Sequence, residues 1–348
     1  MRWSDVLTDL VKGRDLSADQ ASWAMGQILA GDATPVQIAG FAVALRSKGE
    51  SVAELSALAD AMLAKATPIA VDRDAVDVVG SGGDRANTVN ISTMAAVVAA
   101  ACGAKVVKHG NRAASSACGT ADVLAALGVA LDVPPSLQQD VLDETGIVFL
   151  FAPLYHPSLR HASSARGELG IQTTFNFLGP LANPARPVAQ AVGVADEAMA
   201  GLVAGVLAGR GCRGMVFHGS DGLDELTTTT TSRVWAIGGG AVAEGLLEPS
   251  SLGLAPATRT DLVGGDPAYN AGVVHRVLDG EPGPVHDIVA LNAAAALLAY
   301  DGPDLTAPIA DQLAPRLARA RGALTDGSAA RKLREFAAAT TRRRPVTA

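Results

Sequence analysis

Residues 77–93 read DVVGSGGDRANTVNIST and contain the transition from a β-strand to an α-helix. The run Val76–Val79 is short and mostly β-branched, which is typical of a buried strand. A glycine-rich turn at residues 80–83 follows it, and an apolar helix is predicted over residues 92–102. A strand, a tight turn and a helix in this order indicate an α/β unit.

The same alternation continues along the chain. Strands are predicted at Val76–Val79, Lys105–Val107, Val129–Asp132, Ile147–Phe151, Val188–Val194, Gly214–His218 and Arg233–Ile237. Helices are predicted between them at residues 92–102, 120–127, 135–145, 157–169 and 197–209. Further on, a strand is expected near 241–247 and helices near 268–279, 285–301, 306–323 and 327–339. This order implies right-handed crossovers and a mainly parallel sheet with helices on both faces.

The first 66 residues show a purely helical pattern instead. Ser17, Thr34 and Ser51 each stand three residues before a Gln or Glu, which is the signature of a capping box at a helix start. We therefore expect a small all-helical domain over residues 1–66, joined by a segment near 157–183, and an α/β domain over residues 67–348.

Composition excludes several classes of protein. Of the 348 residues, 49% are hydrophobic and 18% are charged, which is enough apolar material for a core and unlike a disordered chain. No apolar run is long enough for a membrane span, and the N-terminus lacks the apolar region of a signal peptide. The net charge of −7 opposes nucleic-acid binding, and three widely spaced cysteines without a metal-ligand motif fit a reduced cytoplasm.

The turn at residues 80–83 could bind an anion, because glycines allow backbone N–H groups to approach it and the helix that follows adds its positive end. It is not a dinucleotide fingerprint, since Arg85 stands where the third glycine is required, and no Gly-Lys-Ser/Thr of a Walker A loop follows. The hydroxyl and amide side chains of Thr88, Asn90, Ser92 and Thr93 favour a phosphate ligand over a purely structural turn.

A second polar segment, residues 108–122, reads KHGNRAASSACGTAD and follows the strand that ends at Val107. It therefore lies at the carboxyl end of a strand, where open α/β sheets bind ligands. Its cationic, amide and hydroxyl groups suit a polyphosphate or a phosphosugar. The alternative is a solvated loop.

The third segment, residues 221–226, reads DGLDEL and follows the strand that ends at His218. The adjacent carboxylates of Asp224 and Glu225 repel each other unless they are solvated or bridge a cation. Oxygen ligands without nearby His or Cys favour Mg²⁺ shared with substrate phosphates. A charged surface turn is the alternative.

The fourth segment combines residues 156–166, HPSLRHASSAR, with residues 175–184, FNFLGPLANP. Arg166 lies on a predicted helix and is a candidate clamp for a carboxylate, although an ordinary surface arginine has the same pattern. No Ser-His-Asp or Cys-His arrangement is found in the sequence, so we assign no general base.

Together, these four segments resemble the anthranilate phosphoribosyltransferase family in order and spacing, from about residue 5 to residue 335. The resemblance implies a small helical domain and a large α/β domain, as in type II nucleoside phosphorylases, and a homodimer formed through the helical domain. It also implies transfer of the phosphoribosyl group of phosphoribosyl pyrophosphate to the amine of anthranilate, in tryptophan biosynthesis.

The resemblance implies roles for individual residues. Phosphoribosyl pyrophosphate would be held by Gly80, Ser81, Gly82, Gly83, Asp84, Thr88, Asn90, Ile91, Ser92, Thr93, Lys108, Asn111, Arg112, Ser115, Ser116 and Thr120. Anthranilate would be contacted by Gly80, His109, Asn111, His156 and Arg166. Two Mg²⁺ ions would be bound by Ser92, Asp224 and Glu225. The chain departs from the family pattern at Leu159 and Gly167, both near the expected anthranilate path.

Two alternatives have sequence features against them. A type II pyrimidine nucleoside phosphorylase shares the fold but differs in the glycine turn and in the segment that begins at Lys108. A non-enzymatic nucleic-acid-binding paralogue is expected to lose the acidic segment and to gain basic charge, whereas this chain keeps Asp224 and Glu225 and has a net charge of −7.

Overall fold

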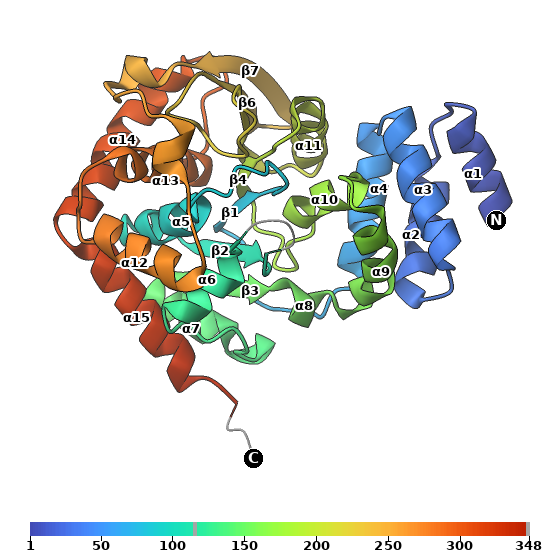
Figure 1. Ribbon diagram of the computed structural model, residues 1–348, viewed down its shortest axis with the longest axis horizontal. Coiled ribbons are helices and arrows are strands. Elements are labelled where there is room, and N and C mark those ends of the chain that lie inside the picture. Colours follow the sequence, from blue (N-terminus) through green and yellow to red (C-terminus); the bar gives the residue numbers. More distant parts are fainter. Residues whose placement is uncertain (114–116, 346–348) are drawn as a thin grey trace.

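The computed structural model describes residues 1–113 and 117–345 (Figure 1). Its strands are β1 (Val76–Gly80), β2 (Val106–Gly110), β3 (Ile147–Phe151), β4 (Ala189–Gly193), β5 (Arg213–Gly219), β6 (Ser232–Gly238) and β7 (Ala241–Leu247). Its α-helices are α1 (Trp3–Val11), α2 (Ala18–Ala30), α3 (Pro35–Lys48), α4 (Val52–Ala64), α5 (Ile91–Ala101), α6 (Thr120–Ala126), α7 (Gln138–Thr145), α8 (Ala152–Tyr155), α9 (Arg160–Leu169), α10 (Thr174–Leu178), α11 (Glu197–Gly209), α12 (Pro267–Leu278), α13 (Pro284–Asp301), α14 (Ile309–Thr325) and α15 (Ser328–Arg342).

The strands form one sheet in the order β3-β2-β1-β4-β5-β6-β7. Strands β1 to β5 run parallel, and β6 and β7 extend the sheet as antiparallel strands. The chain order reverses beside β1, because β2 and β3 lie on one side of it and β4 and β5 on the other. The mainly parallel sheet predicted from the sequence is thus confirmed, and the reversal marks the edge where such sheets bind ligands.

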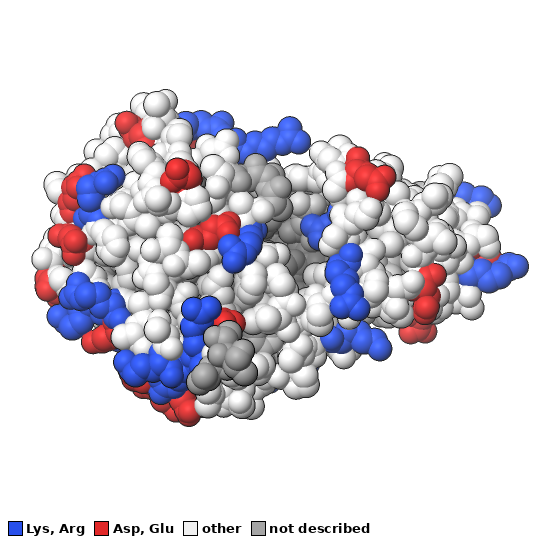
Figure 2. Space-filling view, turned by 60° about the horizontal axis from the view of Figure 1, so that its bottom comes forward, with Lys and Arg blue, Asp and Glu red and all other residues white. Residues whose placement is uncertain are grey.

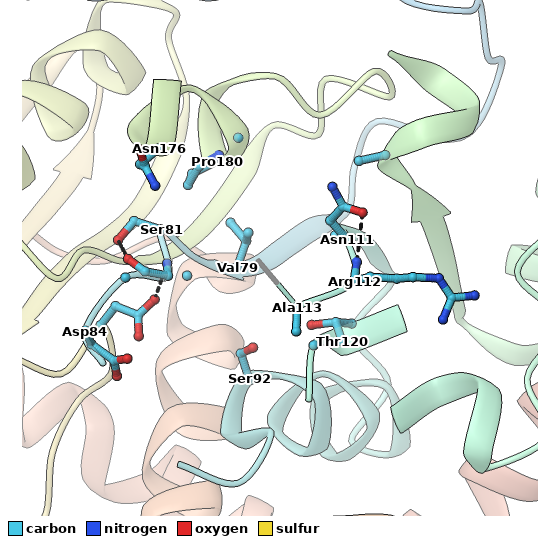
Figure 3. A pocket seen from close by; sticks show the side chains of 18 of the residues that line it. Val79, Ser81, Asp84, Ser92, Asn111, Arg112, Ala113, Thr120, Asn176 and Pro180 are labelled. Carbon is cyan, nitrogen blue, oxygen red and sulfur yellow. Dashed lines mark hydrogen bonds between the residues drawn. The ribbon is translucent and has the colours of Figure 1, made fainter. Parts of the chain in front are cut away.

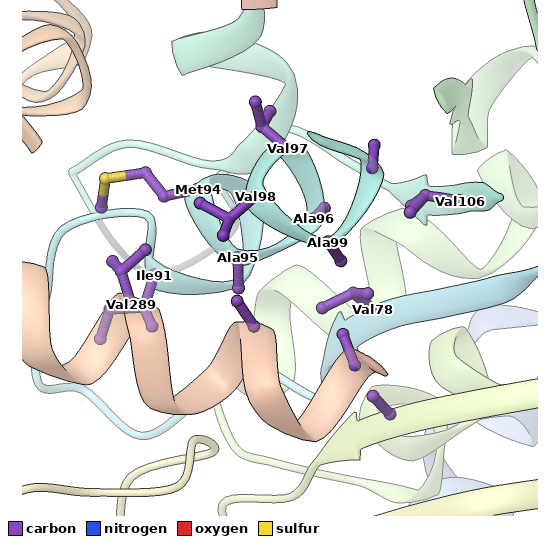
Figure 4. Close-up of a cluster of buried hydrophobic side chains, with 14 of the residues drawn as sticks. Val78, Ile91, Met94, Ala95, Ala96, Val97, Val98, Ala99, Val106 and Val289 are labelled. Carbon is purple, nitrogen blue, oxygen red and sulfur yellow. The ribbon is translucent and has the colours of Figure 1, made fainter. Parts of the chain in front are cut away.

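Alternate buried residues of the central strands β1, β4 and β5 belong to two different cores. On β1, Val76 and Val78 pack in the core that contains α5 and α13, whereas Val79 packs in the core that contains α11 and the N-terminal helices. Figure 4 shows part of the first core, in which α5 packs against α13. Because helices cover both faces of the sheet, its central strands carry apolar side chains on both sides, and the burial of these side chains stabilises the sheet.

The N-terminal helices α1 to α4 pack together, and α9 and α10 join them from a later part of the chain (Figure 1). All three predicted capping boxes are present, at Ser17, Thr34 and Ser51. In each, the hydroxyl accepts from the backbone N–H three residues on, and the Gln or Glu side chain there accepts from the capping residue's own N–H.

Two crossing segments lie side by side between the helical part and the sheet. The backbone N–H of Thr67 donates to the carbonyl of Tyr155 at 2.8 Å, and its hydroxyl donates to the carbonyl of Leu154 at 3.0 Å. These bonds tie the segment that enters β1 to the segment that leaves β3. The helical part and the sheet are therefore connected by more than one segment of the chain.

One predicted element is wrong: Val129–Asp132 forms no strand. Its backbone instead meets the C-terminal helix, since the N–H of Ala130 donates to the hydroxyl of Thr340 at 3.1 Å. Prolines at 134 and 135, which cannot donate to a sheet ladder, follow closely. The apolar side chain of Val129 is buried without strand pairing. No helix in the described parts of the chain is long and apolar enough to cross a bilayer.

Candidate active site

A cavity of about 340 Å³ opens at the carboxyl ends of β1, β2 and β5, and residues of α9 and α10 also line it. Figure 2 shows the surface hollowed between the two parts of the molecule, with Lys and Arg side chains on both sides of the hollow. Figure 3 shows side chains of the glycine turn, of the start of α5 and of the segment after β2 around this space. The three polar segments after β1, β2 and β5 therefore meet at the reversal of strand order.

A pair of glycines on neighbouring strands makes room for the acidic segment. Gly80 of β1 and Gly193 of β4 are partners in the sheet register. A Cβ on Gly80 would lie 2.2 Å from the Asp224 carboxylate, and one on Gly193 would lie 1.6 Å from the Asp224 carbonyl. Gly82 donates its N–H to Asp224 Oδ2 at 2.7 Å. The glycine turn and the acidic segment thus form one structural unit.

The glycine turn also contacts the segment after α9. The Nε2 group of Gln172 donates to the carbonyl of Gly83 at 2.9 Å. Gly83 has a φ of +84°, and a Cβ there would lie 1.9 Å from Gln172 Nε2. The left-handed backbone favours glycine at this position, and a larger residue would also displace the end of the Gln172 side chain.

Burial and mutual repulsion raise the pKa values of the acidic side chains. Burial, and then repulsion by Asp84, raises the pKa of Asp224 to about 7. Burial and the Asp224 carboxylate hold the pKa of Glu225 well above its ordinary value, opposed by the charge of Lys108 and by a hydrogen bond from the backbone N–H of Ser92. Burial also raises the pKa of Asp84. Three acids at one place in a poorly solvated site favour either protonation or a bound cation.

Lys108 is the buried cation beneath these acids. Its side chain is 3% exposed, its ammonium donates to the Val78 carbonyl, and it lies 3.3 Å from the hydroxyl of Ser92. Burial lowers the pKa of Lys108, and the charges of Asp77, Glu225 and Asp224 oppose that shift. One ammonium that is already bonded to the backbone cannot neutralise three carboxylates.

The donor set fits Mg²⁺. The Ser92 hydroxyl and the carboxylates of Asp224 and Glu225 line the cavity and offer only oxygen. Within residues 1–113 and 117–345, no three Asp, Glu, His or Cys side chains form a complete metal cage. Ions at this place would therefore need oxygens from a bound phosphate, which is the usual way Mg²⁺ is held beside phosphorylated substrates.

Asn90 and Thr93 connect loops around the cavity. Asn90 donates to the Cys118 carbonyl at 3.1 Å and accepts from Asn270 Nδ2 at 2.9 Å. Thr93 is 2% exposed, and its hydroxyl lies 3.4 Å from that of Thr120. Asn90 thus lines the cavity with most of its amide already paired, while Thr93 supports the wall from behind.

The end of the cavity near the helical part is aromatic and less charged. The Arg166 guanidinium lies over the ring of Phe175, 5.4 Å from its centroid. The rings of His109 and His156 meet edge to face with centroids 5.3 Å apart. Burial, followed by repulsion from His156, lowers the pKa of His109 to about 3, and burial lowers the pKa of His156. Both imidazoles are therefore neutral near pH 7.

The structure brings nearly all sequence-predicted residues together. Those that line the cavity are Gly80, Ser81, Gly82, Gly83, Asp84, Thr88, Asn90, Ile91, Ser92, Lys108, His109, Asn111, Arg112, Thr120, His156, Arg166, Asp224 and Glu225. Thr93 lies behind the wall, and Ser115 and Ser116 fall outside the described residues. Of the two departures from the family pattern, Leu159 lines the cavity and Gly167 is not among its lining residues.

Several lining residues had no assigned role in the sequence analysis. Phe175, Asn176, Gly179 and Pro180 line the cavity and belong to the fourth motif, so that motif was the signal that could have found them. Met62 also lines it, from α4, and nothing in the local sequence distinguishes it from a core methionine.

Comparison with known proteins agrees with this architecture. Residues 4–66 match the family model described as "Glycosyl transferase family, helical bundle domain", and residues 72–330 match "Glycosyl transferase family, a/b domain". The fold and the site therefore define a glycosyltransferase built from a helical bundle and an α/β part.

The relatives specify the family within this class. The anthranilate phosphoribosyltransferase of a Nocardioides species is 57% identical over 341 residues, covering 98% of this chain and 99% of that protein. The enzyme of the same name from Thermobifida fusca is 55% identical, covering 95% of this chain and 94% of that protein. The crystal structure of anthranilate phosphoribosyltransferase from Thermus thermophilus has a TM-score of 0.89 at 41% identity, covering 97% of this chain and 99% of that one. The chain belongs to the anthranilate phosphoribosyltransferase family.

A further relative has been solved with ligands bound. The anthranilate phosphoribosyltransferase from Saccharomyces cerevisiae in complex with phosphoribosyl pyrophosphate and Mg has a TM-score of 0.87 at 26% identity, covering 98% of each chain.

Proposed function

We propose that this protein transfers the 5-phosphoribosyl group of phosphoribosyl pyrophosphate to the amine of anthranilate. The products are N-(5-phosphoribosyl)anthranilate and pyrophosphate, and the reaction is the second step of tryptophan biosynthesis from chorismate. The observation that carries the proposal is the meeting of the glycine turn, the segment after β2 and the acidic segment at one cavity that also contains Arg166. The identity of 57% to a relative of that name favours it over a pyrimidine nucleoside phosphorylase or a nucleic-acid-binding paralogue.

Phosphoribosyl pyrophosphate would lie against the sheet edge. The backbone of the glycine turn and the N-terminus of α5 offer N–H groups to its pyrophosphate, and Lys108, Asn111 and Arg112 add polar donors beside it. Ser115 and Ser116 stay predicted ligands. Donors that are already fixed in position stabilise the charge that develops on the departing oxygens, without rearrangement during the reaction.

Two Mg²⁺ ions are proposed at Ser92, Asp224 and Glu225. When bound, they would neutralise charge on the pyrophosphate leaving group. The raised pKa values of Asp224 and Glu225 support a cation here. Burial removes the water that would stabilise each charged carboxylate, and a bound cation would stabilise that charge in its place.

Anthranilate would bind at the end formed by α9 and α10. Arg166 is placed to hold its carboxylate, and the planar guanidinium is kept in position by Phe175. The neutral rings of His109 and His156 provide an uncharged path beside it. Because the anthranilate amine is nucleophilic when neutral, no side chain is needed as a strong base, and none is assigned.

The proposal extends to the assembly and location of the protein. Residues 1–66, with the segment near 157–183, form the helical domain, which would pair with that of a second copy. In support, α3 exposes Val36 (81%) and Val43 (38%), seven residues apart and so on one side of the helix. A cytoplasmic homodimer that binds neither membrane nor nucleic acid is proposed.

The direct test is turnover. The purified protein, given phosphoribosyl pyrophosphate, Mg²⁺ and anthranilate, is expected to release pyrophosphate, and far less of it with substituted benzoates that lack the amine. Phosphorolysis of a pyrimidine nucleoside, without turnover of anthranilate, would overturn the proposal.

A further inference from the structure

The fully buried stretch of helix α13 contains one polar residue where its pattern calls for an apolar one. Residues 288–299 are all buried, and Asn292 is the only polar side chain among them. Burying an amide costs free energy unless its hydrogen bonds are made. The amide of Asn292, which is 2% exposed, must therefore have partners within the protein.

Those partners lie on the acidic segment. Asn292 Oδ1 accepts from the backbone N–H of Leu226 at 3.0 Å, and Asn292 Nδ2 donates to the backbone carbonyl of Leu226 at 2.9 Å. A further bond from Nδ2 to the Ile288 carbonyl at 2.9 Å fixes the amide against its own helix. One side chain thus pairs with both backbone groups of the residue directly after Glu225, as a neighbouring strand would.

The opposite side of the acidic segment is held separately. Asp221 accepts from the hydroxyl of Thr227 at 2.9 Å and from the N–H of Leu223 at 3.2 Å. These bonds close the turn on itself, but they do not attach it to the rest of the molecule. Gly82 attaches Asp224 to the glycine turn. Within the described residues, the side-chain hydrogen bonds that attach the segment to α13 are those of Asn292.

The same helix supports the other proposed metal ligand. Helix α13 packs against α5, whose first turn carries Ser92 (Figure 4). A shift of the acidic segment away from α13 would therefore separate Glu225 from Ser92.

We propose that Asn292 is a positioning residue that presets the proposed Mg²⁺ site by fixing the backbone beside Glu225. The proposal rests on the proposed function, in which Asp224 and Glu225 bind Mg²⁺ together with pyrophosphate. It assigns Asn292 no contact with the substrate or the metal. Loss of the Asn292 amide should weaken metal binding more than it weakens the binding of anthranilate or of the ribose of phosphoribosyl pyrophosphate.

The test measures metal binding directly. Asn292→Leu keeps the branched shape and the number of heavy atoms of the side chain but removes all three hydrogen bonds. The metal-free variant is titrated with Mn²⁺ in the presence of pyrophosphate, and bound ion is counted by electron paramagnetic resonance. The dissociation constant is expected to rise at least about tenfold, the equivalent of about 1.4 kcal/mol. Gln190→Leu, which removes a buried amide from β4, controls for loss of stability and should leave Mn²⁺ binding unchanged.

Each result has one interpretation. Unchanged Mn²⁺ binding by folded Asn292→Leu, while Asp224→Asn abolishes it, would overturn the role of Asn292 and leave the metal site in place. Unchanged binding by Asp224→Asn would instead overturn the proposed metal ligands. If Asn292→Leu does not fold, Asn292→Ala provides the same comparison, because it removes the same three hydrogen bonds without adding bulk.

Discussion

Gly82 and Asp224 are 142 residues apart in the chain, yet the backbone N–H of Gly82 donates to the Asp224 carboxylate at 2.7 Å. This bond joins a proposed phosphate-binding turn directly to a proposed metal ligand. When a cation takes the Asp224 oxygen, the N–H of Gly82 becomes available to a phosphate oxygen. The two binding events are therefore expected to support each other.

The first prediction concerns the acidic pair. Asp224→Asn or Glu225→Gln should cost several kcal/mol of transition-state stabilisation, roughly the scale of a lost metal contact, and activity should require Mg²⁺. Steady-state kinetics across a range of Mg²⁺ concentrations measures the loss as kcat/KM. Glu244→Gln, on the exposed strand β7, serves as the control. Full activity in excess chelator would contradict the prediction.

The second prediction concerns the glycine turn. Gly83→Val places a β-branched side chain at a φ of +84° and against Gln172, so the turn should shift. The KM for phosphoribosyl pyrophosphate should rise, or turnover should cease, while the fold persists at a cost of about 1–2 kcal/mol. Gly103 has a similar φ of +93° and open space around it. Gly103→Val is therefore the control that shows the effect of backbone strain without a change in the glycine turn. A fully active, cooperatively melting Gly83→Val protein would show that the turn is structural.

The third prediction concerns pH and the buried carboxyl of Asp77. Asp77 accepts from the His109 backbone N–H at 3.1 Å and from Asn183 at 2.8 Å, and burial raises its pKa to about 6. Because this value lies above that of the unfolded chain, the folded protein keeps the proton to higher pH. Stability from this group is complete below about pH 4 and is lost as the pH rises through about 6.

Comparison with Asp77→Asn isolates this effect. Between about pH 4 and pH 7, the wild type should lose about 2–3 kcal/mol of unfolding free energy relative to the variant. The variant has a fixed cost of its own, since the new amide faces the amide of Asn183, but that cost does not depend on pH. Urea unfolding at several pH values gives the difference. Parallel curves for the two proteins would show that Asp77 does not titrate in this range.

A structural feature could be predicted from the sequence when the residues that form it lie close together in the chain. A capping box spans four residues, so Ser17, Thr34 and Ser51 could be identified with their partners. Strand pairing is not local. Val129–Asp132 has the composition of a strand, but its backbone partner is Thr340, which is 210 residues away.

The same distinction holds for the site. The resemblance to the family grouped Ser92, Lys108 and Asp224 before the structure was known. Their meeting has a physical reason, because the ends of parallel strands share one sheet edge. Gln172 and Asn292 could not be placed, since their partners Gly83 and Leu226 lie 89 and 66 residues away. An asparagine inside an apolar helix is visible in sequence, but its partner is not.

The fourth prediction concerns assembly. If α3 forms the contact between two copies, Val36→Glu should raise the dimer dissociation constant at least about tenfold, or about 1.4 kcal/mol, because a charge would be buried. Light scattering at micromolar concentration measures the mass. Leu246→Glu changes an equally apolar, 58% exposed residue on β7 and should leave the dimer intact. A monomeric wild-type protein would reject the predicted interface.

The last prediction separates anthranilate recognition from phosphate binding. Anthranilate carries a carboxylate beside its amine, and a planar, permanently charged guanidinium can bind that group while it leaves the amine free. Arg166 lies over Phe175 and lines the cavity from α9, whereas the proposed phosphate ligands lie on the glycine turn and the segment after β2, so its loss should affect one substrate only. Arg166→Ala should weaken anthranilate binding by about 1.5–3 kcal/mol, the usual contribution of a hydrogen bond to a charged group. Arg160→Ala, at the exposed start of the same helix, is the matched control and should change neither affinity. Calorimetric titration of each substrate into each variant decides the matter. Equal loss for both substrates would mean that Arg166 supports the architecture of the site, and an unchanged affinity for anthranilate would exclude it as the carboxylate clamp.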